Sequence, residues 1–352
     1  MYLDDKRRNI ADIRIYNNGL VDPFDNVYNC VYSLVGIQAQ YFNCARISIR
    51  NRVDYGITDF SFPEKSVIRF WGQRNTLHLF AAEDYNLITD LFVNENNWVK
   101  KYAQDLNLNC DRLLDEISLL LQEEKMLSAY EIKKHFEDRE FIKLFDWSGA
   151  FILSSYNKIL YSLVSEKNEK KYVKNDIPYS VPDINTLFER YYKYYGPASI
   201  DDFFHWTGLR RNGELSAKMD LFLKEKRYLI YKGRKLFFSD EQSDKINIDY
   251  PVVLGKFDPL LVAYKDKSWI CDETKKKYIW KKAGQIDGVI ISEAGVIATW
   301  KVRSDRLSKD VDIFNFDLSY IDKSKIETRI CFLINEKKEN VRFMYRSIDY
   351  GR

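Results

Sequence analysis

The feature that most constrains the fold is a set of helices followed by a β-hairpin, clearest in residues 185–238. Apolar spacing and turn residues predict helices over 185–195, 199–206 and 216–226, and strands over 228–231 and 235–238. Ser199-Ile200-Asp201-Asp202 has the residue types of a capping box, which opens the second helix. The strands flank the basic turn Lys232-Gly233-Arg234. Helix, turn, helix and hairpin together predict a winged helix-turn-helix unit.

The same order of elements is predicted in two earlier segments. In the first, helical spacing precedes strands over 67–71 and 76–80. In the second, Ser128-Ala129-Tyr130-Glu131 has the residue types of a capping box. Helices over 113–121 and 151–164 precede the polar run 165–174, which is either the tip of a second wing or a plain surface loop. We therefore predict three tandem winged-helix units, over residues 1–108, 109–177 and 178–248.

Beyond Pro251 the pattern changes to short apolar runs separated by turn residues. The runs that predict strands are 252–254, 260–264, 288–291, 296–300 and 330–333. Such a meander predicts a small β-barrel or a curled sheet over residues 249–352, of which we favour the barrel. The predicted fold class is therefore α+β, with three winged helix-turn-helix units followed by a C-terminal β-barrel.

Composition narrows the class of protein. The chain has 352 residues, 45% hydrophobic and 30% charged, which is ordinary for a globular protein of several compact units. Its apolar runs are well short of the roughly 20 residues that a membrane span needs. Residues 1–8 are charged and lack the apolar core of a signal peptide. We expect a cytoplasmic protein with no membrane association.

The distribution of cysteine and histidine argues against a metal centre. Five cysteines are scattered without a Cys-x-x-Cys pair, and none of the three histidines is spaced for metal ligation with a neighbour. We expect no metal and no other cofactor. The net charge, 55 − 52 = +3, neither supports nor excludes binding to nucleic acid. A nucleic-acid-binding protein of this composition must concentrate its positive charge on one surface.

Two glutamines stand between two predicted helices. An apolar helical pattern over 31–35 breaks at Gly36, Gln38-Ala39-Gln40 follows, and a second helical pattern runs from about Tyr41 to Arg52. Glutamine carries both donors and an acceptor and stays neutral, so a pair can fix a water molecule without burying a charge. Taken alone, the pair is a weak signal, and a solvated loop between helices is the simpler interpretation.

Further motifs follow in a fixed order along the chain. They are Arg74-Asn75-Thr76-Leu77-His78-Leu79, Gly196-Pro197-Ala198-Ser199, Trp206-Thr207-Gly208-Leu209, Phe257-Asp258-Pro259 and Gly295-Val296-Ile297-Ala298-Thr299-Trp300. With the glutamine pair, they resemble the AlkZ-like family of winged-helix DNA glycosylases over about residues 10 to 305. The resemblance implies three winged helices around a DNA-binding channel in a C-shaped molecule, with catalytic Gln38 and Gln40. The AlkX branch of that family has Gln-x-Asp instead.

The glutamine pair also restricts the substrate. Cleavage of a glycosidic bond passes through an oxocarbenium-like sugar. A purine alkylated on N7 is already cationic and leaves as a neutral molecule, so two neutral amides that orient a water suffice. Asp25 lies upstream and Asp54 downstream, and the sequence does not show whether either assists. Because no lysine sits in this motif, we predict a monofunctional DNA glycosylase that leaves an abasic site, with bulky adducts and crosslinks as further candidate substrates.

Several basic residues are candidates for binding double-stranded DNA that contains alkylated purines. The candidates are Arg46, Arg50, Arg74, His78, Lys275, Lys276 and Lys277. Arg46 and Arg50 share a helix face, although that face is equally compatible with plain solvation. Arg74 is otherwise a capping or ion-pairing residue, and His78 a buried strand histidine. The three lysines are expected at the tip of an extended hairpin, where an ordinary charged loop is the simpler interpretation.

The main alternative is a transcription regulator that uses the same winged helices without catalysis. Three units in one chain, the small net charge and the glutamine pair argue against it. A glycosylase relic that binds lesions without turnover is a further alternative. We expect the protein to be a monomer.

Overall fold

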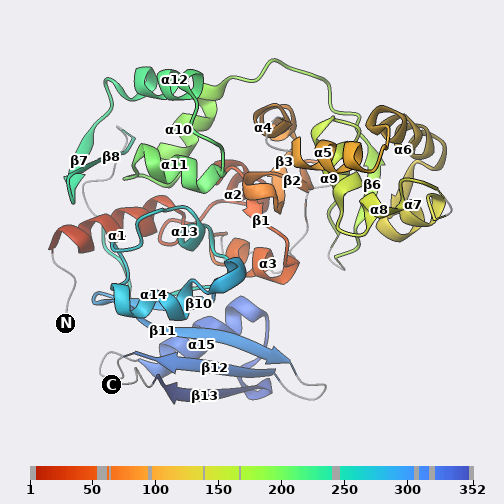
Figure 1. Ribbon diagram of the computed structural model, residues 1–352. Coiled ribbons are helices and arrows are strands. Elements are labelled where there is room, and N and C mark those ends of the chain that lie inside the picture. The colour runs from red at the N-terminus through yellow and green to blue at the C-terminus, as the bar shows by residue number, and fades with distance from the viewer. Residues whose placement is uncertain are drawn as a thin grey trace.

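The computed structural model describes residues 5–53, 62, 65–93, 97–137, 139–165, 168–239, 246–304, 309–316 and 322–348. The α+β fold class is confirmed (Figure 1). Among the described residues, no helix is both long and apolar enough to cross a membrane.

The first segment places a short strand between two helices and follows them with a hairpin. Its elements are α1 (Asp5–Asn17), α2 (Val27–Ser33), β1 (Ile37–Gln38), α3 (Phe42–Arg50), β2 (Val67–Trp71), η1 (Gln73–Asn75), β3 (Leu77–Ala81), η2 (Ala82–Asp84), α4 (Tyr85–Phe92) and α5 (Asn97–Asp105). Asn26 caps α2 by accepting from the Asn29 amide. The predicted break at Gly36 and the predicted β2–β3 hairpin are confirmed.

The second segment repeats this order and shares a sheet with the first. Its elements are α6 (Cys110–Glu124), β4 (Met126–Ser128), α7 (Ala129–His135), α8 (Ile142–Phe145), α9 (Gly149–Tyr156), β5 (Leu160–Leu163) and β6 (Lys171–Lys174). The capping box at Ser128 is present. The predicted helix 151–164 is wrong in its second half, because β5 begins at Leu160. Strand β5 pairs with β2, which gives the six-stranded order β1-β3-β2-β5-β6-β4.

The third segment matches its prediction closely. Its elements are α10 (Ile184–Tyr194), α11 (Ile200–Thr207), α12 (Gly213–Leu223), β7 (Tyr228–Tyr231) and β8 (Arg234–Phe237). The capping box at Ser199 opens α11, and Gly208 ends that helix in a left-handed conformation with φ 75°. Ala198 forms an antiparallel bridge with Phe237, which joins the start of α11 to the hairpin.

The predicted closed β-barrel is not found among the described residues of the last segment, which form an open sheet instead. The last segment contains β9 (Val252–Leu254), α13 (Pro259–Val262), α14 (Glu273–Ile279), η4 (Lys282–Gly284), β10 (Gly288–Ser292), β11 (Gly295–Ser304), β12 (Lys309–Asn315), α15 (Lys323–Ile334), η5 (Lys338–Asn340) and β13 (Val341–Ser347). The strands form an open sheet in the order β13-β12-β11-β10-β9. Strand β13 pairs parallel with β12 after the helical crossover α15, and parallel pairing needs such a crossover rather than a tight turn.

Three predicted elements in this segment are corrected by the same structure. Residues 330–333 belong to helix α15, where Ile326, Ile330 and Leu333 are fully buried at helical spacing. The run 260–264 includes most of helix α13, and residues 271–278, predicted as an extended hairpin, include most of helix α14. Short apolar runs do not distinguish a strand from a buried helix face.

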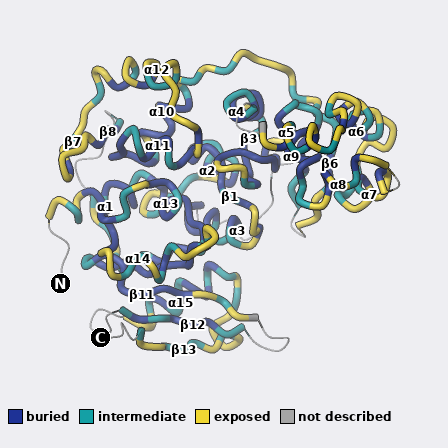
Figure 2. Tube along the Cα trace, viewed as in Figure 1, coloured by how far each residue is buried: buried dark blue, intermediate teal, exposed yellow. Residues whose placement is uncertain are grey.

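The segments pack against one another around the first one. Figure 1 shows α2, β1 and α3 near the centre, with the third segment on one side, the last segment on another and α6 to α9 in a lobe of their own. Figure 2 shows the buried part of the chain concentrated where these segments meet. Arg52, directly after α3, forms an ion pair with Asp258, at 2.6 Å and with both side chains fully buried. The glutamine segment is therefore fixed from several directions.

Candidate active site

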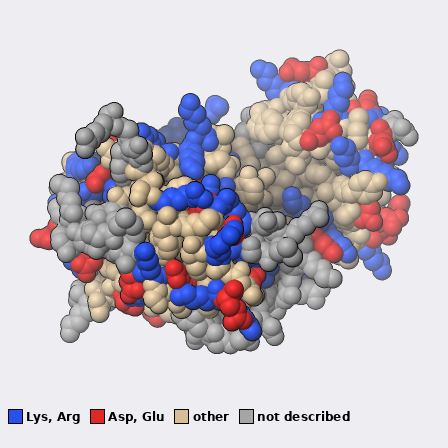
Figure 3. Space-filling view, turned by 90° about the horizontal axis from the view of Figure 1, so that it is seen from below, with Lys and Arg blue, Asp and Glu red and all other residues tan. Residues whose placement is uncertain are grey.

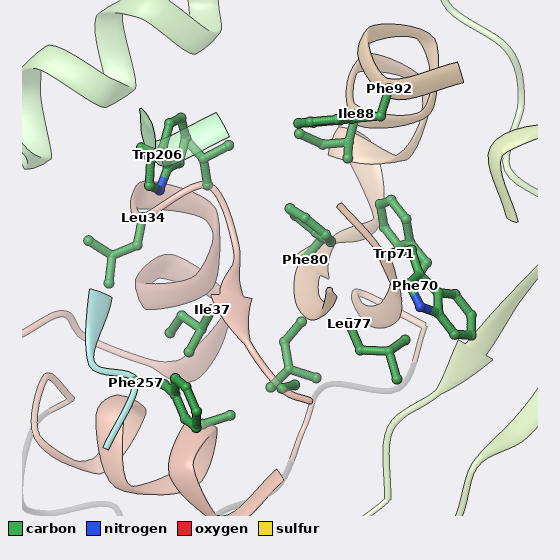
Figure 4. Close-up of a cluster of buried hydrophobic side chains, with 14 of the residues drawn as sticks. Leu34, Ile37, Phe70, Trp71, Leu77, Phe80, Ile88, Phe92, Trp206 and Phe257 are labelled. Atoms are coloured by element: carbon green, nitrogen blue, oxygen red, sulfur yellow. The ribbon is translucent and has the colours of Figure 1, made fainter. Parts of the chain in front are cut away.

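The backbone around the glutamine pair is set by Gly36. Its φ of 90° is left-handed, and a Cβ there would lie 2.4 Å from the Phe80 ring. Only glycine satisfies both conditions, which ends α2 and turns the chain into β1. Gln38 then pairs with His78 of β3, and the Ala39 amide donates to the Leu77 carbonyl at 2.7 Å. Figure 4 shows the buried side chains, among them Ile37, Leu77 and Phe80, that support this arrangement.

The hydrogen bonds of Thr76 fix the orientation of the Gln38 amide. The Thr76 hydroxyl donates to the Gln73 carbonyl at 3.1 Å, so it has only acceptor capacity left for Gln38. Gln38 Nε2 lies 3.4 Å from that hydroxyl oxygen. Gln38 Oε1 is buried without a hydrogen-bond partner among the described residues. Buried polar atoms are normally paired, so this acceptor marks a place for a donor such as water.

Gln40 presents the opposite group. Its Oε1 accepts a hydrogen bond from the Leu77 amide at 3.3 Å, which a backbone N–H can make only with the amide oxygen. The Gln40 side-chain NH2 group is therefore oriented away from Leu77, and Gln40 is exposed. One glutamine of the pair has an acceptor available and the other has donors available. A water molecule, which both donates and accepts, is complementary to this pair.

His78 is a neutral imidazole beside the pair. Its Nδ1 lies 2.9 Å from the Thr76 carbonyl oxygen, so Nδ1 carries the proton and Nε2 is an acceptor. Burial is the main cause that lowers the pKa of His78 to about 4, and Arg74 lowers it further. Since His78 is 7% exposed, it is a buried strand histidine at the pocket wall.

The pocket that contains the pair has a volume of about 400 Å³. It is lined by Gln38, Gln40, Tyr41, Trp71, Gln73, Arg74, Asn75, Thr76, Leu77, His78, Trp147, Ser148, Ile152, Lys170, Trp206, Phe257, Val262, Ala283, Gly284, Gln285 and Ile286. No Asp or Glu belongs to this lining, as far as the described residues go. Asp25 is exposed and accepts from Asn29 at 3.4 Å, and Asp54 lies outside the described residues.

The tip of the β2–β3 hairpin forms one wall of the pocket. Arg74 and Asn75 both have left-handed φ values of 55°, a conformation that Asn adopts more readily than most residues other than glycine. The third segment touches this tip, because a Cβ on Gly208 would lie 2.8 Å from Arg74 Cγ and 3.1 Å from Arg74 Cα. The motifs around Arg74 and Gly208 are thus in direct contact.

Arg50 of α3 and Arg52, two residues beyond that helix, are engaged with the protein. Arg50 Nη1 donates to the Leu333 carbonyl at 2.9 Å, near the end of α15. Arg52 binds Asp258 and also donates to Asn18 and to the Ser48 carbonyl. Arg46 is half-buried and does not line the pocket. Contact of Arg46 or Arg50 with DNA stays a prediction.

The three lysines of α14 lie outside the pocket lining. Lys275 Nζ donates to the Val296 carbonyl at 3.0 Å, and Lys276 forms an ion pair with Glu273. Lys277 is exposed. They lie on a helix, and their contact with DNA stays a prediction.

Sequence reasoning missed two groups that the second segment contributes to the pocket. Lys170 follows Asn168 and Glu169, which accept hydrogen bonds from the buried Arg69 of β2 at 2.8 and 3.2 Å. Trp147 stands in the turn before α9, with Trp98 against its ring at 4.7 Å. The pairing of β2 with β5 brings both to the glutamine pair, and no local pattern signals that pairing. Burial and Arg69 lower the pKa of Lys170.

Comparison with known proteins agrees with this geometry. A family profile described as DNA glycosylase AlkZ-like matches residues 31–327. An interstrand DNA cross-link repair glycosylase of Streptomyces sahachiroi is 22% identical over 307 residues, covering 78% of this chain and 81% of that protein. The solved structure of the Streptomyces sahachiroi DNA glycosylase AlkZ superposes with a TM-score of 0.74 at 18% identity, covering 97% of this chain and 99% of the other.

The fold, the glutamine pocket and these matches define the class of protein as a DNA glycosylase. The profile covers most of the chain, so the chain belongs to the AlkZ-like DNA glycosylase family.

Proposed function

We propose that this glycosylase hydrolyses the N-glycosidic bond of cationic N7-alkylated purines with a water molecule held between Gln38 and Gln40. The observation that carries the proposal is the complementary orientation of the two amides. Gln38 Oε1 is a buried acceptor without a described partner, and the Gln40 amide nitrogen is free of the Leu77 contact. A water donating to Gln38 and accepting from Gln40 would keep a lone pair for the anomeric carbon.

The lack of carboxylates in the described pocket lining agrees with a base that needs no general acid or strong base to leave. The described lining holds glutamines, a neutral histidine, Arg74 and Lys170 but no carboxylate. A normal base leaves poorly and needs an acid or a strong base, which this lining does not offer. An N7-alkylated purine needs neither, because it departs as a neutral molecule. Positioning of the water can contribute up to ~7–11 kcal/mol in favourable cases.

Double-stranded DNA is the proposed partner, bound in a channel of a C-shaped molecule formed by three winged-helix segments. Arg74 and Lys170 approach the pocket from two different segments and are suited to the phosphates on either side of a lesion. Basic side chains gather over the middle of the face shown in Figure 3, while acidic ones lie mostly nearer its edges. Such local concentration supports DNA binding by a chain with a net charge of only +3. We propose that it acts as a monomer.

Bulky adducts and interstrand crosslinks are proposed as further substrates. The curated relative is named for repair of interstrand crosslinks, and the aromatic lining that includes Trp147 and Tyr41 offers contact area to a large adduct. A panel of duplexes with methyl, bulky and crosslinked N7 lesions ranks these candidates.

The test is release of free 7-methylguanine from methylated duplex DNA at neutral pH in the presence of a metal chelator. The expected result is release of the base and an abasic site, without a covalent protein–DNA adduct on borohydride treatment. A covalent adduct would contradict the monofunctional assignment, for which Lys170 is the lysine to examine. A transcription regulator would release no base and would protect one defined DNA sequence instead.

A further inference from the structure

Tyr41 is an exposed aromatic residue in the pocket, directly after Gln40. Its side chain is 49% exposed. It occupies the N-cap of α3 without making a capping hydrogen bond, although Ser, Thr, Asp and Asn are strongly preferred there. With Tyr41 at this position, α3 lacks the stabilisation of a side-chain cap, and a large ring is exposed beside the catalytic pair. Neither cost is explained by the packing of α3.

One face of the Tyr41 ring is covered by Phe257. The two rings are stacked with centroids 5.3 Å apart and planes within 5° of parallel. Phe257 itself is buried and has a left-handed φ of 58°, which a bulky residue adopts only where its surroundings enforce it. The ring behind Tyr41 is thus placed at a conformational cost.

The surroundings of Phe257 enforce this placement. The neighbouring Asp258 forms the buried ion pair with Arg52, and it also accepts from the Leu260 amide at 3.0 Å. On the other side, a Cβ on Gly255 would lie 2.5 Å from Ile47 of α3. Phe257 and Tyr41 are therefore attached rigidly to the same helix. The Phe257-Asp258-Pro259 motif acts as a support for Tyr41.

The opposite face of Tyr41 is not covered by Lys256. Lys256 Nζ lies 5.2 Å from the Tyr41 centroid and 5.0 Å from the Phe257 centroid. Stacked rings are separated by roughly 3.5 Å, and a group on the far face of Tyr41 would lie at least ~7 Å from the plane of Phe257. Lys256 is therefore beside the stack, where it donates to Gln285 Oε1 at 2.7 Å. Among the described residues, Phe257 is the ring that stacks on Tyr41, and the far face of the half-exposed tyrosine is available to a ligand in the pocket as far as these residues go.

We infer that the far face of Tyr41 is the surface on which the alkylated purine stacks while Gln38 and Gln40 hold the water. The inference deepens the proposed function and rests on it. Stacking of a base on an aromatic ring contributes about 1–3 kcal/mol. A cation is further attracted to the electron-rich face of a tyrosine ring. The stack therefore selects a cationic purine over an unmodified one and aligns its glycosidic bond with the glutamine pair.

The experiment measures binding rather than cleavage. The probe is a duplex with 2′-fluoro-7-methyl-2′-deoxyguanosine, because the fluorine disfavours the oxocarbenium-like transition state and keeps the bond intact. Its Kd is compared with that of the same duplex containing guanine, for wild type, Tyr41→Phe, Tyr41→Ala and Tyr130→Ala. Tyr130 is a matched control, since it is 73% exposed and lies on α7 outside the pocket.

The expected result is a wild-type preference for the methylated duplex that Tyr41→Ala lowers by about tenfold. Tyr41→Phe and Tyr130→Ala should keep the preference within about twofold, since both retain the stacking ring. The inference is overturned if the wild type has no preference, if Tyr41→Ala keeps it, or if Tyr41→Ala weakens both duplexes equally. Failure of the wild type to release 7-methylguanine would contradict the proposed function without changing this binding result.

Discussion

The hairpins β2–β3 and β7–β8 follow helices in the same way, yet their surroundings differ. Every residue of β2 and β3 is buried, and they belong to a six-stranded sheet. The other hairpin is a two-stranded sheet with several exposed residues. Gly208 touches the tip of the first hairpin, whereas a Cβ on Gly233 in the second would meet nothing within 4 Å. A repeated local pattern becomes the wall of a site only where neighbouring segments cover it.

The largest expected effect comes from the ion pair that ties the first hairpin to the third segment. Asp84, just after β3, binds Arg190 of α10 at 2.5 and 3.0 Å, and both side chains are buried. Arg190→Met leaves a buried carboxylate without its partner, which should cost about 3–5 kcal/mol of unfolding free energy. The control is Lys218→Met, which removes the exposed Lys218–Glu214 pair of α12 and should leave the urea midpoint nearly unchanged. Urea unfolding measures the stability of both variants, and an equal loss of stability in the two would contradict the comparison.

Two glycines with nearly the same backbone conformation allow a second comparison of the surroundings of the two hairpins. Gly208 has φ 75° and Gly233 has φ 74°, so alanine at either position should cost about 1–2 kcal/mol in backbone strain. At Gly208 the new Cβ also approaches Arg74, which should add about 1 kcal/mol or more and displace the hairpin tip. The unfolding temperature and the rate of 7-methylguanine release should therefore both fall further in Gly208→Ala than in Gly233→Ala. Matching losses in the two variants would mean that the contact with Arg74 is unimportant.

The first hairpin should also make stability depend on pH. The pKa of His78 is lowered to about 4 in the folded state. Between about pH 4 and 6.5, His78 therefore binds a proton in the unfolded chain but not in the folded one. Stability is complete above about pH 6.5 and falls as the pH approaches 4, by up to about 1.4 kcal/mol per pH unit for this group. Urea unfolding at pH 7, 6 and 5 should show a shallower loss for His78→Gln than for wild type. Identical slopes would rule out a buried neutral His78.

The smallest effect concerns DNA affinity. Arg74 lines the pocket and Arg234 is exposed on the second hairpin. If Arg74 neutralises one phosphate, Arg74→Ala makes the negative slope of log affinity against log salt shallower by about 0.9. Arg234→Ala should leave that slope unchanged if the second hairpin lies off the DNA path. A drop for Arg234→Ala alone would reverse the roles assigned to the two hairpins.

The sequence was most informative where structure is local. The capping boxes at Ser128 and Ser199 and the break at Gly36 are each decided within a few residues, and all three are present. The prediction of a C-terminal barrel counted residues 330–333 as a strand. They belong to helix α15, and a run of four residues is too short to reveal a helical period. The place of Lys170 in the pocket could not be predicted from the sequence, for another reason. Its place in the pocket depends on the pairing of β2 with β5, whose paired residues are almost a hundred positions apart.

The central claim is that two uncharged amides hold the water that attacks the sugar. The most direct measurement is the single-turnover rate of 7-methylguanine release by wild type, Gln38→Ala and Gln40→Ala at saturating enzyme. Each substitution should slow release by about a hundredfold or more, comparable to the loss of a positioned polar group in other active sites, while affinity for the inert 2′-fluoro duplex is kept. Full activity in both variants would contradict the claim, although the protein would still belong to the glycosylase family.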